Sequence, residues 1–229
     1  MSPHPEIVDA PCAVRAKRER RKDARPGELL SAAMELFVEK GFAATRAEEV
    51  ATRAGVSKGT LFLYFSSKEE LFKAVVRENI SGRFAQWSAE MDSFSGSSAE
   101  LLRCCMLAWW DRVGSTKAAG ISKLMMSEAG NFPELADFYR NEVVKPGNAL
   151  IRRVLQRGMD SGEFRPVDLE YGVYLVLAPM MFLTTWRHSL GHFVAPQTEL
   201  DPLAYFNTHI DNLLLGLCNQ APLRQSETT

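Results

Sequence analysis

Residues 45–71 read TRAEEVATRAGVSKGTLFLYFSSKEEL, and this stretch decides the fold of the N-terminal part of the chain. Its pattern predicts a short helix that runs to Ala54, a tight turn at Gly55, and a second short helix over residues 58–64. Gly55 provides the left-handed conformation that a sharp turn requires, and Ser57 is a typical N-cap residue. Two short helices joined by a turn of about three residues form a helix-turn-helix unit.

Capping signals mark the starts of helices within and beyond this unit. Thr45 and Glu48 have the spacing of a capping box, in which the hydroxyl accepts from a first-turn amide and the carboxylate reaches back to the cap. The same spacing recurs at residues 67–70 and 97–100. The sequence therefore predicts that Thr45 begins the first helix of the unit.

Helical periodicity continues along the rest of the chain, and no strand-like alternation interrupts it. Further helices are expected over residues 28–40, 68–87, 98–110, 121–129, 133–159 with a bend near Pro146, 170–190 and 202–217. The prediction is an all-α fold, with a small N-terminal helix-turn-helix domain followed by a larger helical-bundle domain. Its parts are a basic flexible arm (1–25), the helix-turn-helix domain (26–72), the larger helical domain (73–220), for which the family resemblance given below implies ligand binding and dimerisation, and a tail (221–229).

Composition is typical of an ordinary globular protein. The chain has 229 residues, 46% of them hydrophobic, and a formal net charge of -1. A nearly neutral chain has no overall attraction for nucleic acid, so any DNA-binding argument depends on where the basic residues lie. The basic arm allows two interpretations, a solvated tail or an arm that touches phosphate.

The cysteines and the longest apolar run indicate a cytoplasmic protein. Cys12, Cys104, Cys105 and Cys218 show no disulfide-framework spacing and no secretory segment precedes them, so we interpret them as reduced thiols. Residues 173–186 are too few to span a bilayer comfortably, which favours a buried helix over a membrane span.

The pattern V-A-x-x-A-G-V-S-x-G-T-L-x-x-Y-F-x-S-K-E-x-L within residues 50–71 resembles the signature of the TetR family of bacterial repressors. The resemblance implies a sequence-specific transcriptional repressor that binds double-stranded operator DNA as a homodimer and is released by a small-molecule effector. Phe62 stands where the family usually has a tyrosine, so a phosphate contact from a hydroxyl there is missing. The positions that match DNA contacts of the family are Thr45, Ser57, Thr60, Tyr64 and Lys68.

Side-chain chemistry supports the same assignment. Lys58, at the start of the second short helix, is the candidate for a base edge because its ammonium can donate to guanine O6 or N7. Thr60 and Tyr64 are placed to reach phosphate or a thymine methyl. Lys68, in the first turn of the next helix, can add its charge to the free amides there and bind phosphate.

Aromatic and methionine side chains of the C-terminal part are candidates for an effector pocket, and a small hydrophobic or aromatic effector would suit them. The alternative, equally open, is an apolar core without a hole, since apolar stripes usually pack. The candidates are Met106, Trp109, Trp110, Met125, Met126, Phe138, Tyr139, Met181 and Trp186.

The last two helices predict the dimer interface. Residues 170–190 are apolar on every side, so they require cover from two directions. Residues 202–217 place apolar side chains at alternating three- and four-residue steps, which is the spacing of a helix-packing seam. We expect a homodimer through both segments.

Other functions have less support in the sequence. No phosphate loop, nucleophile motif or carboxylate-histidine cluster indicates an enzyme, and no cofactor is expected. His188 and His192 lie four residues apart but lack further ligands, so a metal site is not predicted. A DNA-binding architectural protein that senses nothing, and a helical-bundle ligand carrier or enzyme, are the alternatives.

A switch mechanism follows from the predicted arrangement. In a symmetric dimer the recognition helices must lie about 34–36 Å apart to enter successive major grooves. An effector that changes the angle of the linking helix over residues 68–87 would spoil this fit. Trp109 and Trp110 are the expected wall of the cavity beside that helix.

Overall fold

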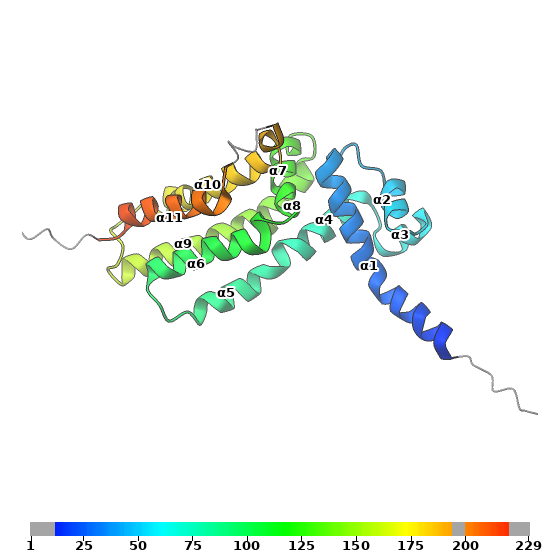
Figure 1. The fold of residues 1–229 in the computed structure, drawn as a ribbon, viewed down its shortest axis with the longest axis horizontal. Coiled ribbons are helices and arrows are strands. Elements are labelled where there is room, and N and C mark those ends of the chain that lie inside the picture. Colours follow the sequence, from blue (N-terminus) through cyan, green and yellow to red (C-terminus); the bar gives the residue numbers. More distant parts are fainter. Residues whose placement is uncertain (1–11, 194–199, 220–229) are drawn as a thin grey trace, which may run out of the picture.

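The computed structural model describes residues 12–193 and 200–219, and over these residues the chain is α-helical, with turns and one isolated bridge between Phe164 and Cys218 (Figure 1). The predicted all-α class is confirmed. The elements are α1 (Cys12–Lys40), α2 (Ala47–Arg53), α3 (Lys58–Tyr64), α4 (Lys68–Asn79), η1 (Ser81–Arg83), α5 (Phe84–Asp92), α6 (Ser98–Trp109), the π-helical η2 (Trp110–Gly114), α7 (Ala119–Glu128), α8 (Pro133–Tyr139), the π-helical η3 (Arg140–Val144), α9 (Lys145–Asp160), α10 (Leu169–Arg187), η4 (Leu190–Phe193) and α11 (Pro202–Leu217).

Helices α1 to α3 form a small unit at one end of the molecule, and α4 leads from it into the bundle (Figure 1). The core of this unit centres on the rings of Phe37, Phe42 and Phe72, whose centroids lie 5.4 to 5.5 Å apart. Apolar side chains of α7 and α8, among them Ile121 and Leu135, belong to the same core. The N-terminal unit is therefore packed directly against two helices of the C-terminal part.

A second core fills the bundle of α6, α9, α10 and α11. Its largest fully buried side chains include Met106, Phe164 and Phe206. Trp109 packs against both cores, at the point where they approach one another. Close packing through a shared side chain gives the two parts a common apolar interior.

The first helix is longer than the sequence pattern predicted. Residues 12–25, expected as part of a basic flexible arm, form the first part of α1, and Pro26 lies inside this helix. This stretch is rich in Ala, Arg, Lys and Glu, which are strong helix formers. Residues 1–11 of the expected arm and 220–229, which include the expected tail, lie outside the described residues.

The helix expected over residues 68–87 is broken. Helix α4 ends at Asn79, Ile80 leaves helical geometry with φ -131° and ψ -71°, and a 3₁₀ turn precedes α5. A side chain at Gly82 would approach the Arg77 carbonyl oxygen to 2.6 Å, so only glycine fits this bend. The link between the parts is consequently a short α4 and not one continuous rod.

The long helix expected over residues 133–159 is also divided, by the π-helical turn η3. Pro146 lies in the first turn of α9, directly after η3. Proline has no N–H and its ring crowds the preceding turn, which explains why the irregularity comes just before it. In place of the expected bend near Pro146, the helix contains the π-helical turn η3, which is wider than an α-helical turn.

The last two helices follow the sequence prediction closely. Asp168 caps α10 and Asp201 caps α11, each carboxylate accepting from two main-chain N–H groups of the first turn. Helix α10 has 19 residues and a mean hydropathy of 1.2, enough by length and composition alone to cross a membrane. It lies here against α7, α9 and α11 in the bundle (Figure 1).

Candidate nucleic-acid interface

Helix α3 is fixed to the unit by one apolar side chain and one cap. Leu61 is completely buried, and it holds the inner side of α3 against α1 and α2. The Ser57 hydroxyl accepts from the Thr60 N–H at 3.1 Å, and the two hydroxyl oxygens lie 2.9 Å apart. These local contacts fix the start and the inner side of α3, so its other side faces outward.

The outer side of α3 carries one cation and three large apolar or aromatic side chains. Lys58 is exposed, and Phe62, Leu63 and Tyr64 have exposed fractions of 40%, 83% and 36%. Exposed leucine on a helix of seven residues is unfavourable in water unless a partner covers it. Apolar side chains at such positions can contact thymine methyl groups in a major groove.

Glu48 of α2 faces the first residue of α3. Its carboxylate forms an ion pair with the Lys58 ammonium, and the hydrogen bond from Lys58 lowers the pKa of Glu48 below its usual value. The Lys58 ammonium also lies 5.8 Å from the centroid of the Phe62 ring. The cation predicted to read a base therefore has two neighbours on the protein surface.

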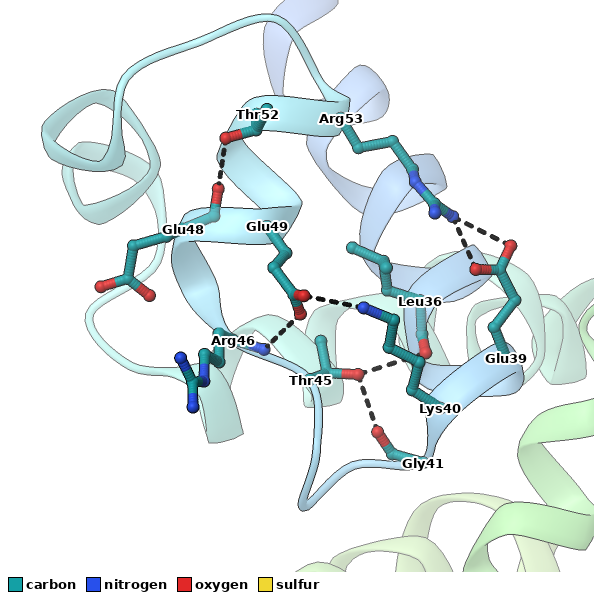
Figure 2. A network of polar contacts seen from close by, with 10 residues as sticks. All are labelled: Leu36, Glu39, Lys40, Gly41, Thr45, Arg46, Glu48, Glu49, Thr52 and Arg53. Atoms are coloured by element: carbon teal, nitrogen blue, oxygen red, sulfur yellow. Dashed lines mark hydrogen bonds and ion pairs between the residues drawn. The ribbon is translucent and has the colours of Figure 1, made fainter.

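Thr45 does not lie on this outer surface. Its side chain is buried, and the hydroxyl donates to the carbonyl oxygens of Gly41 at 2.7 Å and Leu36 at 3.2 Å (Figure 2). The expected capping box of Thr45 and Glu48 does not form: Arg46 is the N-cap of α2 and its side chain accepts no hydrogen bond, so only the reciprocal half is present, with Glu49 accepting from the Arg46 N–H at 3.3 Å. Thr45 ties the loop that precedes α2 to the end of α1.

Lys68 is likewise turned inward. Its ammonium donates to the carbonyl oxygens of Phe42, Ala43 and Thr45 at 2.8, 3.3 and 3.1 Å, and it lies 4.4 Å from the centroid of the Phe42 ring. These three acceptors use the full donor capacity of an ammonium group. Lys68 thus anchors the loop of residues 41–46, which we call the α1–α2 loop.

The α1–α2 loop is held from its other side by the C-terminal part of the chain. The Glu128 carboxylate, at the end of α7, accepts from the N–H groups of Phe42 at 2.8 Å and Ala43 at 3.2 Å. Gly41 has φ +86°, and a side chain there would collide with Glu128. The positive φ therefore favours glycine, and a larger residue would also displace the Glu128 carboxylate from these hydrogen bonds.

Two ion pairs and one close helix approach accompany this contact. Lys117 lies 2.7 Å from Glu35 of α1, and Arg77 of α4 lies 2.6 Å from Glu142, whose pKa it lowers. A side chain at Gly120 of α7 would meet Val38 of α1 at 2.6 Å. Helix α7 is thus the main support of α1 from the regulatory part.

The predicted contact residues therefore fall into two groups. Ser57, Lys58, Thr60 and Tyr64 come together on or beside α3, whereas Thr45 and Lys68 meet behind it at the α1–α2 loop. Sequence reasoning missed Leu63, although inward positions 61 and 65 place residue 63 outward on a helix. It also missed Glu48 and Glu128, and the contact of Glu128 spans 86 residues with no local signal.

The predicted effector residues do not form one site. Met106 and Trp110 belong to the core of the bundle, whereas Met125, Phe138 and Tyr139 belong to the core beside α1. Only Trp109 contacts both groups. Met126 does not have the interior position expected of a pocket residue, because its side chain is 65% exposed.

Several of these side chains have packing roles that explain their presence. The Trp110 ring lies 5.2 Å from Phe206 and beneath the guanidinium of Arg187 at 5.0 Å. The Tyr139 hydroxyl is 2.8 Å from the Ser122 hydroxyl, and burial raises the pKa of Tyr139 to about 12. Met181 lies half-buried on α10, and the Trp186 ring stacks on Phe182 at 6.0 Å.

Among the described residues, no group of three His, Cys, Asp or Glu side chains is suited to a metal ion. A hollow of about 510 Å³ on the bundle is open to solvent, and none of the predicted effector residues lines it. It lies between α6 and the end of α11, lined by Arg103, Asp211, Leu214, Leu215, Cys218 and Asn219.

The fold and the outward side of α3 define a class: a helix-turn-helix DNA-binding protein with a helical C-terminal domain. Residues 29–75 match the family model described as bacterial regulatory proteins, tetR family, and residues 95–191 match the tetracyclin repressor-like C-terminal domain. The chain belongs to the TetR family of bacterial regulatory proteins.

Individual relatives agree with this assignment. The HTH-type transcriptional regulator RutR of Escherichia coli (strain K12) is 29% identical over 213 residues, which cover 86% of this chain and 90% of the relative. The HTH-type transcriptional repressor KstR2 of Mycobacterium tuberculosis is 31% identical over 156 residues, covering 65% and 75%. The structure of FadR from Bacillus subtilis in complex with stearoyl-CoA superposes with a TM-score of 0.69 at 21% identity, covering 82% of this chain and 97% of that one.

Proposed function

We propose that the chain is a cytoplasmic transcriptional repressor that binds operator DNA as a homodimer through α3 and leaves it when a small molecule enters the helical C-terminal domain. The observation that carries the proposal is the outward side of α3, where Lys58 lies beside exposed apolar side chains on a capped helix. A cation and apolar groups on one short helix suit the donor, acceptor and methyl pattern of a major groove.

Contact roles are proposed for the residues on or beside α3. Lys58 donates to a guanine, Ser57, Thr60 and Tyr64 contact phosphate or sugar, and Leu63 contacts a thymine methyl. For Thr45 and Lys68 we propose an indirect role, because their polar groups bond to main-chain carbonyls of α1 and the α1–α2 loop. They hold the start of α2 in the position from which α3 is presented.

The proposed dimer uses the exposed apolar side of α10 and α11. Tyr171 and Leu175 of α10 have exposed fractions of 68% and 65%, and Leu215 of α11 has 69%. Apolar patches of this kind on two neighbouring helices usually mark an interface between proteins. A four-helix interface from two copies would cover both helices and set the spacing of the two α3 helices.

The proposed effector is a small hydrophobic or aromatic molecule. Among the similar structures, FadR of Bacillus subtilis is described in complex with stearoyl-CoA, which carries a long apolar acyl chain, and KstR2 is described as a ketosteroid transcriptional regulator. Methionine and aromatic side chains of α6, α10 and α11, among them Met106, Met180 and Phe206, make the interior of this bundle apolar as well. Ligand entry is expected to shift α7, and Glu128 then transmits the shift to the α1–α2 loop.

Selection of binding sites from a random duplex library tests the proposal. The wild-type protein should enrich a palindrome whose half-sites lie one helical turn apart, and Lys58→Ala should lose selectivity at one position per half-site, by about 1–3 kcal/mol. Lys40→Ala is the matched control, because Lys40 pairs with Glu49 at 2.7 Å on the side toward α1. Equal loss on enriched and random DNA for Lys58→Ala would show that Lys58 contacts phosphate only.

A further inference from the structure

An acidic side chain stands on the surface that should meet a polyanion. Glu48 and Lys58 form an ion pair in which their side chains remain 55% and 54% exposed. Figure 2 shows the Glu48 carboxylate on the side of α2 away from α1, whereas Glu49 and Arg53 of the same helix turn toward α1. Glu48 is therefore the acidic residue of α2 that lies beside the recognition helix.

The contribution of this ion pair to the stability of the fold is too small to explain why it is present. Ion pairs between exposed side chains contribute about 0–1 kcal/mol, because both charges are well solvated and both side chains lose freedom. A carboxylate near phosphates also weakens sequence-independent attraction to DNA. The pair therefore contributes little to the stability of the folded protein, and it lies on the surface where a charge would act on DNA binding.

We propose that Glu48 is a positioning residue for specificity: it holds the Lys58 ammonium toward a base edge and away from the phosphates. This inference rests on the proposed function. The Glu48 carboxylate accepts one Lys58 N–H, which leaves two donors for the O6 and N7 acceptors of one guanine. Without Glu48, the flexible stem of Lys58 can reach phosphate, a contact that carries no sequence information.

The first experiment compares Glu48→Gln with the wild type by library selection and by titration of enriched and random duplexes over a salt series. Selectivity at the Lys58 position should fall about tenfold per half-site. Affinity for random DNA should rise, and the slope of log K against log salt should steepen by about 0.9 for each additional phosphate that the variant neutralises.

Glu39→Gln is the matched control. Glu39 pairs with Arg53 at 2.9 Å in the same unit, on the side toward α1. This variant removes the same charge without touching Lys58, so its site preference should equal that of the wild type. Thermal unfolding of each variant checks that the fold is retained.

A second variant separates positioning from simple repulsion. Glu48→Asp keeps the charge but is one methylene shorter, so it releases Lys58 while the repulsion of phosphate remains. Selectivity should therefore fall as in Glu48→Gln, whereas affinity for random DNA should rise less than in Glu48→Gln. In a Lys58→Ala background, Glu48→Gln should cause no additional loss of selectivity, because Glu48 acts through Lys58.

The inference is overturned if Glu48→Gln leaves both the enriched motif and the salt slope unchanged, or if it still reduces selectivity when Lys58 is absent. Either result leaves the proposed function standing, provided that the wild type enriches a palindrome. Failure of the wild type to enrich any motif overturns the proposed function itself, and this inference with it.

Discussion

The carboxylate of Glu128 lies 2.8 Å from the main-chain nitrogen of Phe42, and this hydrogen bond joins the end of α7 to the α1–α2 loop. The Ala43 N–H donates to the same carboxylate from 3.2 Å. On the opposite side, the Lys68 ammonium binds the carbonyl oxygens of Phe42 and Ala43. The loop that precedes the DNA-binding helices is therefore held by one anion and one cation.

Replacement of Glu128 by alanine is expected to lower the free energy of unfolding by about 1.5–3 kcal/mol, the usual contribution of hydrogen bonds to a charged group. Amide hydrogen exchange at Phe42 and Ala43 should accelerate, because both donors lose their acceptor. Urea unfolding and exchange measured by NMR check both effects. Glu78→Ala, which removes an exposed carboxylate from α4, should change neither. Unchanged protection at both amides in Glu128→Ala would contradict this role.

Lys68→Met keeps the length of the side chain and removes its charge. Because three carbonyl oxygens and the Phe42 ring surround the ammonium, the variant should lose about 1–3 kcal/mol of stability. The slope of log K against log salt should stay at the wild-type value if Lys68 has the proposed indirect role, in which it neutralises no phosphate. A slope flatter by about 1 per half-site would show that Lys68 turns outward to bind phosphate.

Leu175→Glu should convert the proposed dimer into a monomer. Leu175 is 65% exposed on α10, and a charge at the centre of an apolar interface is left unpaired and desolvated. Sedimentation velocity at micromolar concentration measures the change. Met126→Glu is the matched control, because Met126 is also 65% exposed but lies on α7. A monomeric wild type, or a dimeric Leu175→Glu variant, would argue against this interface.

Stability is expected to depend on pH through His209 of α11. Its Nε2 is buried without a hydrogen-bond partner, and burial lowers its pKa. The folded state therefore resists protonation, so as pH falls below the unfolded value of about 6.5 the unfolded chain binds the proton first and stability decreases. The decrease in stability ends once the pH is below the pKa of His209 in the folded state. Urea unfolding at pH values of about 7.5 and about 5.5, on either side of the unfolded value, should show a smaller decrease for His209→Leu than for the wild type.

The fold was largely predictable because local signals mark most helix ends. The structure contains the predicted helix caps at Ser97 with Glu100 and at Asp201 with Pro202. It also contains the predicted tight turn at Gly55, which has a positive φ. These features depend on residues within one helical turn, so they are visible without tertiary information. Buried Leu61 follows in the same way from helical spacing.

Contacts across long separations could not be predicted from the pattern. Lys68 has the same position in its helix whether it binds phosphate or carbonyl oxygens, and only the path of the α1–α2 loop decides between them. Thr45 turns away from the surface for the same reason. The aromatic residues of the bundle show the same limit, since their spacing indicates burial but not which of two cores receives them.

The π-helical turn η3 has a consequence for the tolerance of this chain to changes in length. In an α-helix, one residue advances the direction of side chains by about 100°, so a single deletion rotates everything that follows. A π turn already contains one surplus residue per turn. Loss of one residue from Arg140–Val144 would restore ordinary α-helical bonding and leave the buried side of α9, with Ile151, Val154 and Leu155, facing the same core. The same deletion inside α9 would turn that side toward solvent, so gaps in an alignment of relatives should concentrate in η3.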